Sequence, residues 1–439
     1  MMRFAALSAA LLFLTAFNAA ASVFDTETFT LDNGMQVAVI ENRRAPVVTH
    51  MVWYKTGAID DPAGKSGVAH VLEHMMFKGT PAVPDGEFSK IVAKNGGEEN
   101  AFTSYDYTAY YQNIARDRLE LVMFLESDRM KNLRFSPQDF EPELEVVKEE
   151  RLMRTENNPA GILDERRRAV LWGEHPYGRP VIGTKKELPA LTPDDARRFY
   201  REHYTPENAV LVVAGDISAA ELKPLAEKYY GAIAPGRTPA VKRLFPVPAP
   251  LKSKLEMRHP QAKLYSLRRS YIVPSYLSDG RERAHAYAVL NEILGTYHLG
   301  KMYKHFVAGK KTAQSATTAY DGFTLDKGTF SFFLTARDGE SLSGLESELD
   351  RFADPASVTQ KDLEKAKKRL IADLEYLNDD PETAANLVGT FYVLGLSVED
   401  LKNRTANIEA VTLSDVRKAY ADMLASASVT TYLMPREAP

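Results

Sequence analysis

Alternating apolar and polar positions predict β-strands in the first half of the chain. In FTLDNGMQVAVIEN (residues 29–42), Asp-Asn-Gly is typical of a hairpin turn and alternate apolar residues follow it. VVTHMVWYKTGA (residues 47–58) also has the pattern of a strand. DARRFYREHYTPENAVLVVAGDI (residues 195–217) predicts a helix, a break at proline and then a buried strand.

The second half shows a similar mixture. KLYSLRRSYIVPS (residues 263–275) predicts a strand, RERAHAYAVLNEILG (residues 281–295) a helix ending at its glycine, and GTFSFFLTA (residues 328–336) another strand. Strands mixed with longer helices indicate the α+β class. The order of strands and helices recurs loosely in the two halves, which hints at a duplicated unit.

A proline-rich segment separates these halves. At 439 residues, the chain is long enough for more than one domain. Residues 235–261 contain prolines that interrupt both helix and strand patterns, so we expect a linker there. The predicted domains are residues 22–234 and residues 262–439.

The first 21 residues have the layout of a secretory signal peptide. Arg3 supplies a positive start, residues 4–17 are mainly apolar, and three alanines at 19–21 offer a small-residue cleavage site. The next arginine is Arg43, whereas a mitochondrial transit peptide would be rich in arginine. No later segment is long and apolar enough to span a membrane. We therefore expect export, with the bacterial periplasm as the compartment.

Composition narrows the possible chemistry. A formal net charge of −4 argues against a nucleic-acid partner. The sequence contains no cysteine, so disulfides and thiolate ligands are excluded. Any zinc site must use histidine and carboxylate side chains.

The candidate chemistry begins at HVLEH (residues 70–74). On a helix, His70, Glu73 and His74 fall within roughly one quadrant. Two imidazoles at this spacing can bind one zinc ion, and a carboxylate beside them can take a proton from zinc-bound water. The alternative is that both histidines lie at the edge of an ordinary amphipathic helix.

A third ligand is expected from the segment at residues 136–158. Ser136 before Pro137 is typical of a helix start, and acidic residues follow it. Glu143 and Glu150 are one heptad apart and share a face of the predicted helix. One could coordinate a metal while the other orients a ligand histidine, although a solvated acidic face would show the same pattern.

These motifs resemble the pitrilysin/insulinase-type inverzincin metallopeptidases, which carry the inverted H-x-x-E-H order. The resemblance implies that Glu150 is the third zinc ligand and that Glu143 supports the site. Glu149 is the neighbouring alternative, but it does not share the Glu143 face.

A second block agrees with this family. NGGEENAFTSYDYTAYY (residues 95–111) resembles the family's edge strand, with which the substrate peptide pairs by β-augmentation. The resemblance implies that Asn100 and Ala101 lie beside the scissile bond. Taken alone, the segment would be an ordinary strand of a sheet.

The similarity covers nearly all of the mature chain and implies a fold. We expect two related α+β domains, each an antiparallel sheet covered by helices, with zinc in the first only. Half-length members such as the mitochondrial processing peptidase pair two chains into a clamshell, and this chain has the half length. The implied reaction is peptide-bond hydrolysis, with Zn²⁺ held by His70, His74 and Glu150 and with Glu73 as general base.

The second half departs from the family pattern. The family places an arginine and a tyrosine, seven residues apart, where they stabilise the oxyanion. In the matching FVAGKKTAQ (residues 306–314), Val307 and Gln314 stand at these positions, and no arginine occurs between Arg283 and Arg337. Tyr320 remains open as a substitute. We therefore expect a homologous half-length partner to supply the arginine and tyrosine.

Three functions compete. The first is an exported zinc endopeptidase that acts on peptides or unfolded segments. The second is a non-catalytic scaffold or partner-binding subunit of the same fold, and the third is a zinc store or sensor. The complete zinc set favours the peptidase, and a zinc store gives no reason for the non-ligand Glu73.

Overall fold

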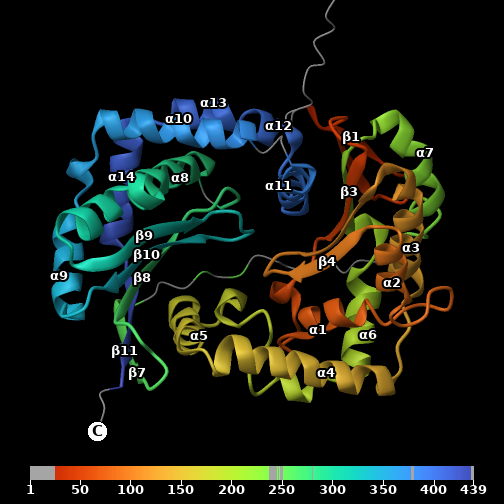
Figure 1. Ribbon diagram of the computed structural model, residues 1–439, viewed down its shortest axis with the longest axis horizontal. Coiled ribbons are helices and arrows are strands. Elements are labelled where there is room, and N and C mark those ends of the chain that lie inside the picture. The colour runs from red at the N-terminus through yellow and green to blue at the C-terminus, as the bar shows by residue number, and fades with distance from the viewer. Residues whose placement is uncertain are drawn as a thin grey trace, which may run out of the picture.

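The computed structural model describes residues 25–236, 245, 247, 251–278, 280–376 and 380–436 (Figure 1). The predicted signal peptide lies outside this range, as does much of the predicted linker. Across the described residues, every helix is too short or too polar to cross a membrane.

The first half builds a six-stranded sheet in the order β1-β2-β6-β3-β5-β4. The predicted hairpin is confirmed, because β1 pairs antiparallel with β2. One pair, β2 with β6, is parallel, which corrects the expectation of a purely antiparallel sheet. Several helices separate these two strands in the chain, which allows the crossover that parallel pairing requires. The strands are β1 (Glu27–Thr30), β2 (Gln36–Glu41), β3 (Val47–Tyr54), β4 (Glu98–Thr103), β5 (Thr108–Ala115) and β6 (Ala209–Gly215).

The second half builds a five-stranded sheet in the order β7-β11-β8-β10-β9, and β7 pairs parallel with β11. Strand β7 lies inside the predicted linker, so that expectation was wrong at its C-terminal end. The reason is visible in the sequence: exposed Lys254, Glu256 and Arg258 alternate with the more buried Leu255 and Met257. The strands are β7 (Ser253–His259), β8 (Ser266–Val273), β9 (Ala313–Asp321), β10 (Gly328–Ala336) and β11 (Ser428–Pro435).

The hint of a duplicated unit is confirmed by the topology. Apart from β1, both sheets place their strands in the order first, fifth, second, fourth, third along the chain. In both, the first and fifth strands are parallel and the remaining neighbours are antiparallel.

Helices cover both faces of each sheet. One face of the first sheet forms a core with α1, α3, α6 and α7, and one face of the second forms a core with α8, α9, α10 and α14. The helices are α1 (Val68–Met75), α2 (Glu87–Lys94), α3 (Leu119–Asn132), α4 (Pro137–Arg151), α5 (Pro159–Trp172), α6 (Pro193–His203), α7 (Ala219–Tyr229), α8 (Arg281–Gly295), α9 (Leu342–Phe352), α10 (Gln360–Tyr376), α11 (Pro381–Val393), α12 (Val398–Lys402), α13 (Arg404–Ala410) and α14 (Leu413–Ala425).

The two halves exchange one helix each. Helix α5, from the first half, contacts β7, β8 and β11, whereas α11, from the second half, contacts β2, β3 and β6 (Figure 1). Gly389 on α11 lies against the buried Trp53 of β3, and a Cβ there would approach the indole ring to 2.2 Å. The two halves therefore share a hydrophobic core, which holds them in one relative position.

Buried polar groups also join the halves. The Tyr177 hydroxyl donates to Asp106 at 2.8 Å, and the Leu325 amide donates to the same carboxylate at 3.2 Å. His175 Nε2 lies 3.1 Å from an oxygen of Asp326. Because buried polar groups are costly when unpaired, this set favours one arrangement of the two halves.

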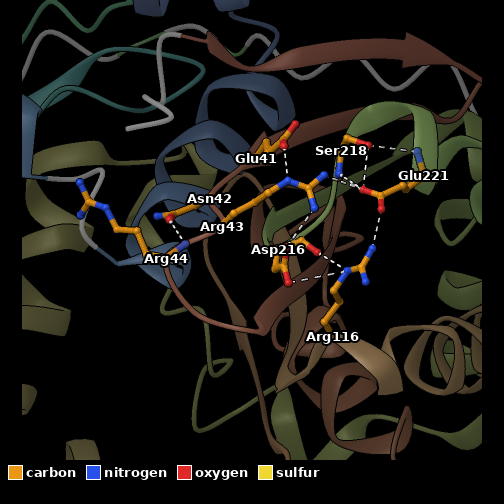
Figure 2. A network of polar contacts seen from close by, with 8 residues as sticks. All are labelled: Glu41, Asn42, Arg43, Arg44, Arg116, Asp216, Ser218 and Glu221. Atoms are coloured by element: carbon orange, nitrogen blue, oxygen red, sulfur yellow. Dashed lines mark hydrogen bonds and ion pairs between the residues drawn. The ribbon is translucent and has the colours of Figure 1, made fainter. Parts of the chain in front are cut away.

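An exposed network of charged residues lies at the end of the first sheet where β2 and β6 finish. Figure 2 shows Arg43, just after β2, reaching the carboxylates of Glu41, Asp216 and Glu221. Glu221 also accepts the amide and hydroxyl hydrogen bonds of Ser218 at the start of α7. The network links the ends of β2 and β6 to α7, although exposed ion pairs add little stability.

Candidate metal centre

Helix α1 carries the HVLEH sequence and is anchored at its N-terminus. The buried Asp61 carboxylate accepts from the amides of Gly67 at 2.6 Å and Ala69 at 3.0 Å. Gly67 has φ 92°, and a Cβ there would lie 2.8 Å from the Ile182 carbonyl oxygen. The left-handed backbone and the close neighbour explain why glycine stands at this helix start.

Helix α4 crosses near α1 and carries the two glutamates. The Ser136 hydroxyl accepts from the Asp139 amide and the Asp139 carboxylate accepts from the Ser136 amide, so the predicted helix start is confirmed. The regular helix ends at Arg151 and a π-helical turn follows over Leu152–Glu156, so the prediction of one helix to residue 158 was too long. The chain breaks there because Asn158 and Pro159 begin α5.

The structure brings His70, His74 and Glu150 together. One ligand atom from each residue lies within 4.8 Å of the others. Glu150 Oε2 is 3.7 Å from His70 Nε2 and 3.4 Å from His74 Nε2. Two imidazole nitrogens and one carboxylate oxygen that converge on one point fit a zinc site with an open fourth position.

Glu143 orients one of these histidines. Its Oε1 lies 2.8 Å from His74 Nδ1, and its Oε2 accepts from Lys78 Nζ at 2.7 Å. With Nδ1 occupied, His74 presents Nε2 toward Glu150. A carboxylate that fixes the histidine tautomer in this way is a common support for metal ligands.

The two histidines differ electrostatically. Burial lowers the pKa of His70 to about 4, which keeps this imidazole neutral. Burial also acts on His74, but its hydrogen bonds to Glu143 and Glu150 outweigh that effect and raise the pKa to about 9. The hydrogen bond to His74 in turn lowers the pKa of Glu143 to about 2.

Glu73 lies beside this group but belongs to a different set of contacts. Its side chain is buried, and one of its oxygens accepts a hydrogen bond from the Thr103 hydroxyl on β4. Burial raises the pKa of Glu73 above that of an ordinary carboxyl group. A carboxylate held next to the metal site with a raised pKa is suited to accept and release a proton.

The structure also distinguishes between Glu149 and Glu150 as the candidate ligand on α4. Glu149 is exposed, while Glu150 is half-buried and faces the histidines. Arg154, one turn further on, pairs with the other oxygen of Glu150 at 2.6 Å.

A cavity of about 1,240 Å³ opens over the three candidate ligands and Glu73. Asn100 and Ala101 line it from β4, the last strand of its sheet, as expected of a strand that can pair with a peptide. Thr103, Arg154 and Arg168 also line it, and none of the three was a predicted site residue. Thr103 follows Asn100 and Ala101 in the block that resembles the family, which was its signal, whereas the isolated arginines carry no spacing signal and only the fold reveals them.

The residues at which the sequence departs from the family pattern lie outside this cavity. Within the part of the chain that the structure describes, the lining of this cavity does not include Val307, Gln314 or Tyr320. Tyr320 is half-buried against both cores and donates its hydroxyl to the Pro274 carbonyl at 2.7 Å. The Tyr320 hydroxyl is therefore engaged outside the lining of this cavity, which argues against Tyr320 as the substitute for the family's arginine and tyrosine.

Two duplicated α+β units, with an inverted H-x-x-E-H helix and a downstream glutamate in the first unit alone, define a class of two-domain metallopeptidase folds. Residues 36–185 match "Insulinase (Peptidase family M16)", and residues 190–370 match "Peptidase M16 inactive domain". The chain belongs to this insulinase-type M16 family, as its motifs indicated.

Relatives and solved structures agree. The chain is 28% identical to the zinc protease PqqE of Helicobacter pylori over 93% of each sequence. It is 31% identical to an uncharacterized zinc protease of Mycobacterium leprae, over 71% of this chain and 69% of that protein. The crystal structure of a protease from Helicobacter pylori superposes with a TM-score of 0.87 at 27% identity, covering 93% of this chain and 99% of that one.

Proposed function

We propose that this protein is a zinc-dependent endopeptidase that hydrolyses peptides or unfolded segments. The observation that carries the proposal is the convergence of His70, His74 and Glu150 at one wall of the cavity, with the buried Glu73 beside them. The zinc protease names of its relatives support the same chemistry.

The metal would be held by His70, His74 and Glu150, with Glu143 and Arg154 supporting the ligands. Bound there, Zn²⁺ supplies Lewis acidity that polarises the scissile carbonyl and activates water. Glu73 accepts a proton from the attacking water and later delivers it to the leaving amine. Thr103 holds the Glu73 carboxylate in place through its hydrogen bond.

The substrate is proposed to add to the first sheet as a further strand. β4 has one neighbour, β5, and its Asn100 and Ala101 line the cavity. Main-chain hydrogen bonding along β4 would align an extended peptide across the metal with little dependence on its side chains.

The proposal includes export and a partner. The basic, apolar and small-residue layout of residues 1–21 supports passage into the bacterial periplasm. The engaged hydroxyl of Tyr320, with Val307 and Gln314 outside the cavity lining, supports a homologous half-length subunit that supplies arginine and tyrosine.

Replacement of Glu73 tests the catalytic proposal. Glu73→Gln should retain the fold and the zinc, while peptide hydrolysis falls by about two orders of magnitude or more because the general base is lost. Zinc content, circular dichroism and cleavage of an unstructured peptide by the assembled enzyme provide the three readouts. Normal turnover by a folded, zinc-loaded Glu73→Gln protein would rule out this mechanism and leave the scaffold function.

A further inference from the structure

A cluster of three arginines surrounds one carboxylate where α5 meets the second sheet. Asp164 on α5 accepts from Arg167 at 2.7 and 3.0 Å and from Arg168 at 3.1 Å. Arg268, on β8 of the second sheet, donates to the same carboxylate. We call these four residues the Arg168 cluster.

Negative charge in the Arg168 cluster does not balance the positive charge. Among the described residues, Asp164 and Asp321 are the acidic groups that act most strongly on the three arginines, so three guanidinium groups face two carboxylates. Arg167 is 1% exposed, and its Nη1 and the Nε of Arg268 are buried without a hydrogen-bond partner among the described residues. Burial and the neighbouring Arg167 lower the pKa of Arg268 to about 10, which shows that its positive charge is repelled by the other arginines.

The Arg168 cluster lies at the wall of the cavity of about 1,240 Å³ over the candidate metal centre, which we call the large cavity. Asp164 and Arg168 both line that cavity, and the Arg168 guanidinium lies 5.2 Å from the centre of the Tyr105 ring, which lines it too. Asp164 also lines a second cavity of about 270 Å³, between α5 and the second sheet, together with Arg167 and Arg268. Of the three arginines, Arg168 is the one in the lining of the large cavity, so it is the one that a group bound there can contact directly.

We propose that the Arg168 cluster binds a carboxylate of the peptide substrate and thereby favours acidic peptides. This inference rests on the proposed peptidase function and deepens it by naming a substrate class. Guanidinium groups match the planar geometry of a carboxylate and are weakly hydrated, which makes them effective where water is excluded. The carboxylate is either an Asp or Glu side chain or the C-terminus of the peptide.

A binding experiment separates this inference from catalysis. Zinc-loaded Glu73→Gln protein is titrated into fluorescent ten-residue peptides, and anisotropy gives the Kd. One neutral amidated peptide is the reference, a second carries a free C-terminal carboxylate, and a series places a single Glu at each position in turn. We expect a Glu peptide or the free-acid peptide to bind about tenfold more tightly than the reference, the size typical of a hydrogen bond to a charged group.

Variants assign the preference to the cluster. In the same background, Arg168→Gln should reduce the preference to about onefold, and Arg168→Lys should retain part of it. Arg166→Gln is the matched control, because Arg166 is an exposed arginine on the same helix, outside the cavity lining. Arg268→Gln gives a second test should Arg168→Gln fail to fold, as judged by circular dichroism.

The failures are distinguishable. Equal binding of acidic and neutral peptides by the parent protein would overturn the carboxylate site and leave the peptidase proposal intact. An acidic preference that survives in Arg168→Gln and Arg268→Gln would overturn the assignment to this cluster. Absence of binding for every peptide would contradict both proposals.

Discussion

Adjacent residues of α4 differ in what they can do because a helix turns about 100° per residue. Glu150 faces the histidines, and Glu149 is exposed. We predict that Glu150→Gln lowers zinc content well below one per chain, because an amide oxygen is a poorer ligand than a carboxylate. Glu149→Gln, the matched control, should keep full occupancy when both proteins are analysed by elemental analysis after dialysis. Full zinc in Glu150→Gln would remove Glu150 from the ligand set.

Asp61 offers a test based on pH. Burial raises its pKa to about 7, whereas in an unfolded chain it is about 4. Between these values the folded protein binds more protons than the unfolded one, so this group stabilises below about pH 4 and its contribution is lost as pH rises through about 7. Asp61→Asn lacks this titration.

The measurement compares wild type with Asp61→Asn. The difference in free energy of unfolding, wild type minus variant, should fall by an amount on the order of a few kcal/mol between pH 4 and pH 8. Denaturant titrations of the metal-free proteins give these values. A constant difference across this range would show that Asp61 does not titrate as the structure indicates.

The sequence reveals residues whose roles depend on local spacing. Positions 70, 73 and 74 share a helix face by geometry alone, so their proximity could be predicted before any fold was known. Thr103 and Arg168 reach the same cavity from a separate strand and a separate helix. Their place depends on long-range packing, and no periodicity in one sequence contains that information.

At the scale of elements, the same distinction applies. The first hairpin and the start of α4 follow from turn and capping residues, and both are confirmed. The parallel pairs β2/β6 and β7/β11 join strands far apart in the chain, and helix-separated pairing leaves no local signal. The sequence does not predict β7 because the prolines before it interrupt the strand pattern, although its own residues alternate.

The repeated topology places equivalent pairs of helices in the two halves, and their contacts differ. With β1 left out of the count, α1 and α8 each follow the second strand of their sheet, and α4 and α10 are each the second helix after the fourth strand. Where α1 and α4 bring histidines and glutamate together, α8 and α10 are joined by an ion pair between Glu292 and Arg369. Among the described residues, the candidate metal ligands lie in the first half alone.

At the scale of the whole molecule, the cavity over the candidate metal centre brings together three candidate metal ligands and Glu73, and its nearest cations among the described residues are already paired with carboxylates. The cations lining the cavity include Lys78, which pairs with Glu143, and Arg154, which pairs with Glu150. We predict that the zinc-loaded chain alone cleaves an unstructured peptide weakly. Addition of a half-length relative that carries the arginine and tyrosine should raise the rate by about 10²–10³, the usual effect of an oxyanion donor.

The control for this prediction is the relative alone, which lacks the zinc motif and should be inactive. Glu73→Gln in the mixed assembly should abolish the gain, which assigns the activity to this chain's site. We expect that a homodimer does not replace the partner, since both copies have Val307 and Gln314 at the two positions. Full activity of the chain alone would contradict the partner requirement and direct attention to Arg154, whose side chain is 72% exposed and beside Glu150. Arg154 would then be the donor that stabilises the oxyanion. Arg154→Gln should in that case lower the rate of the single chain by about 10²–10³.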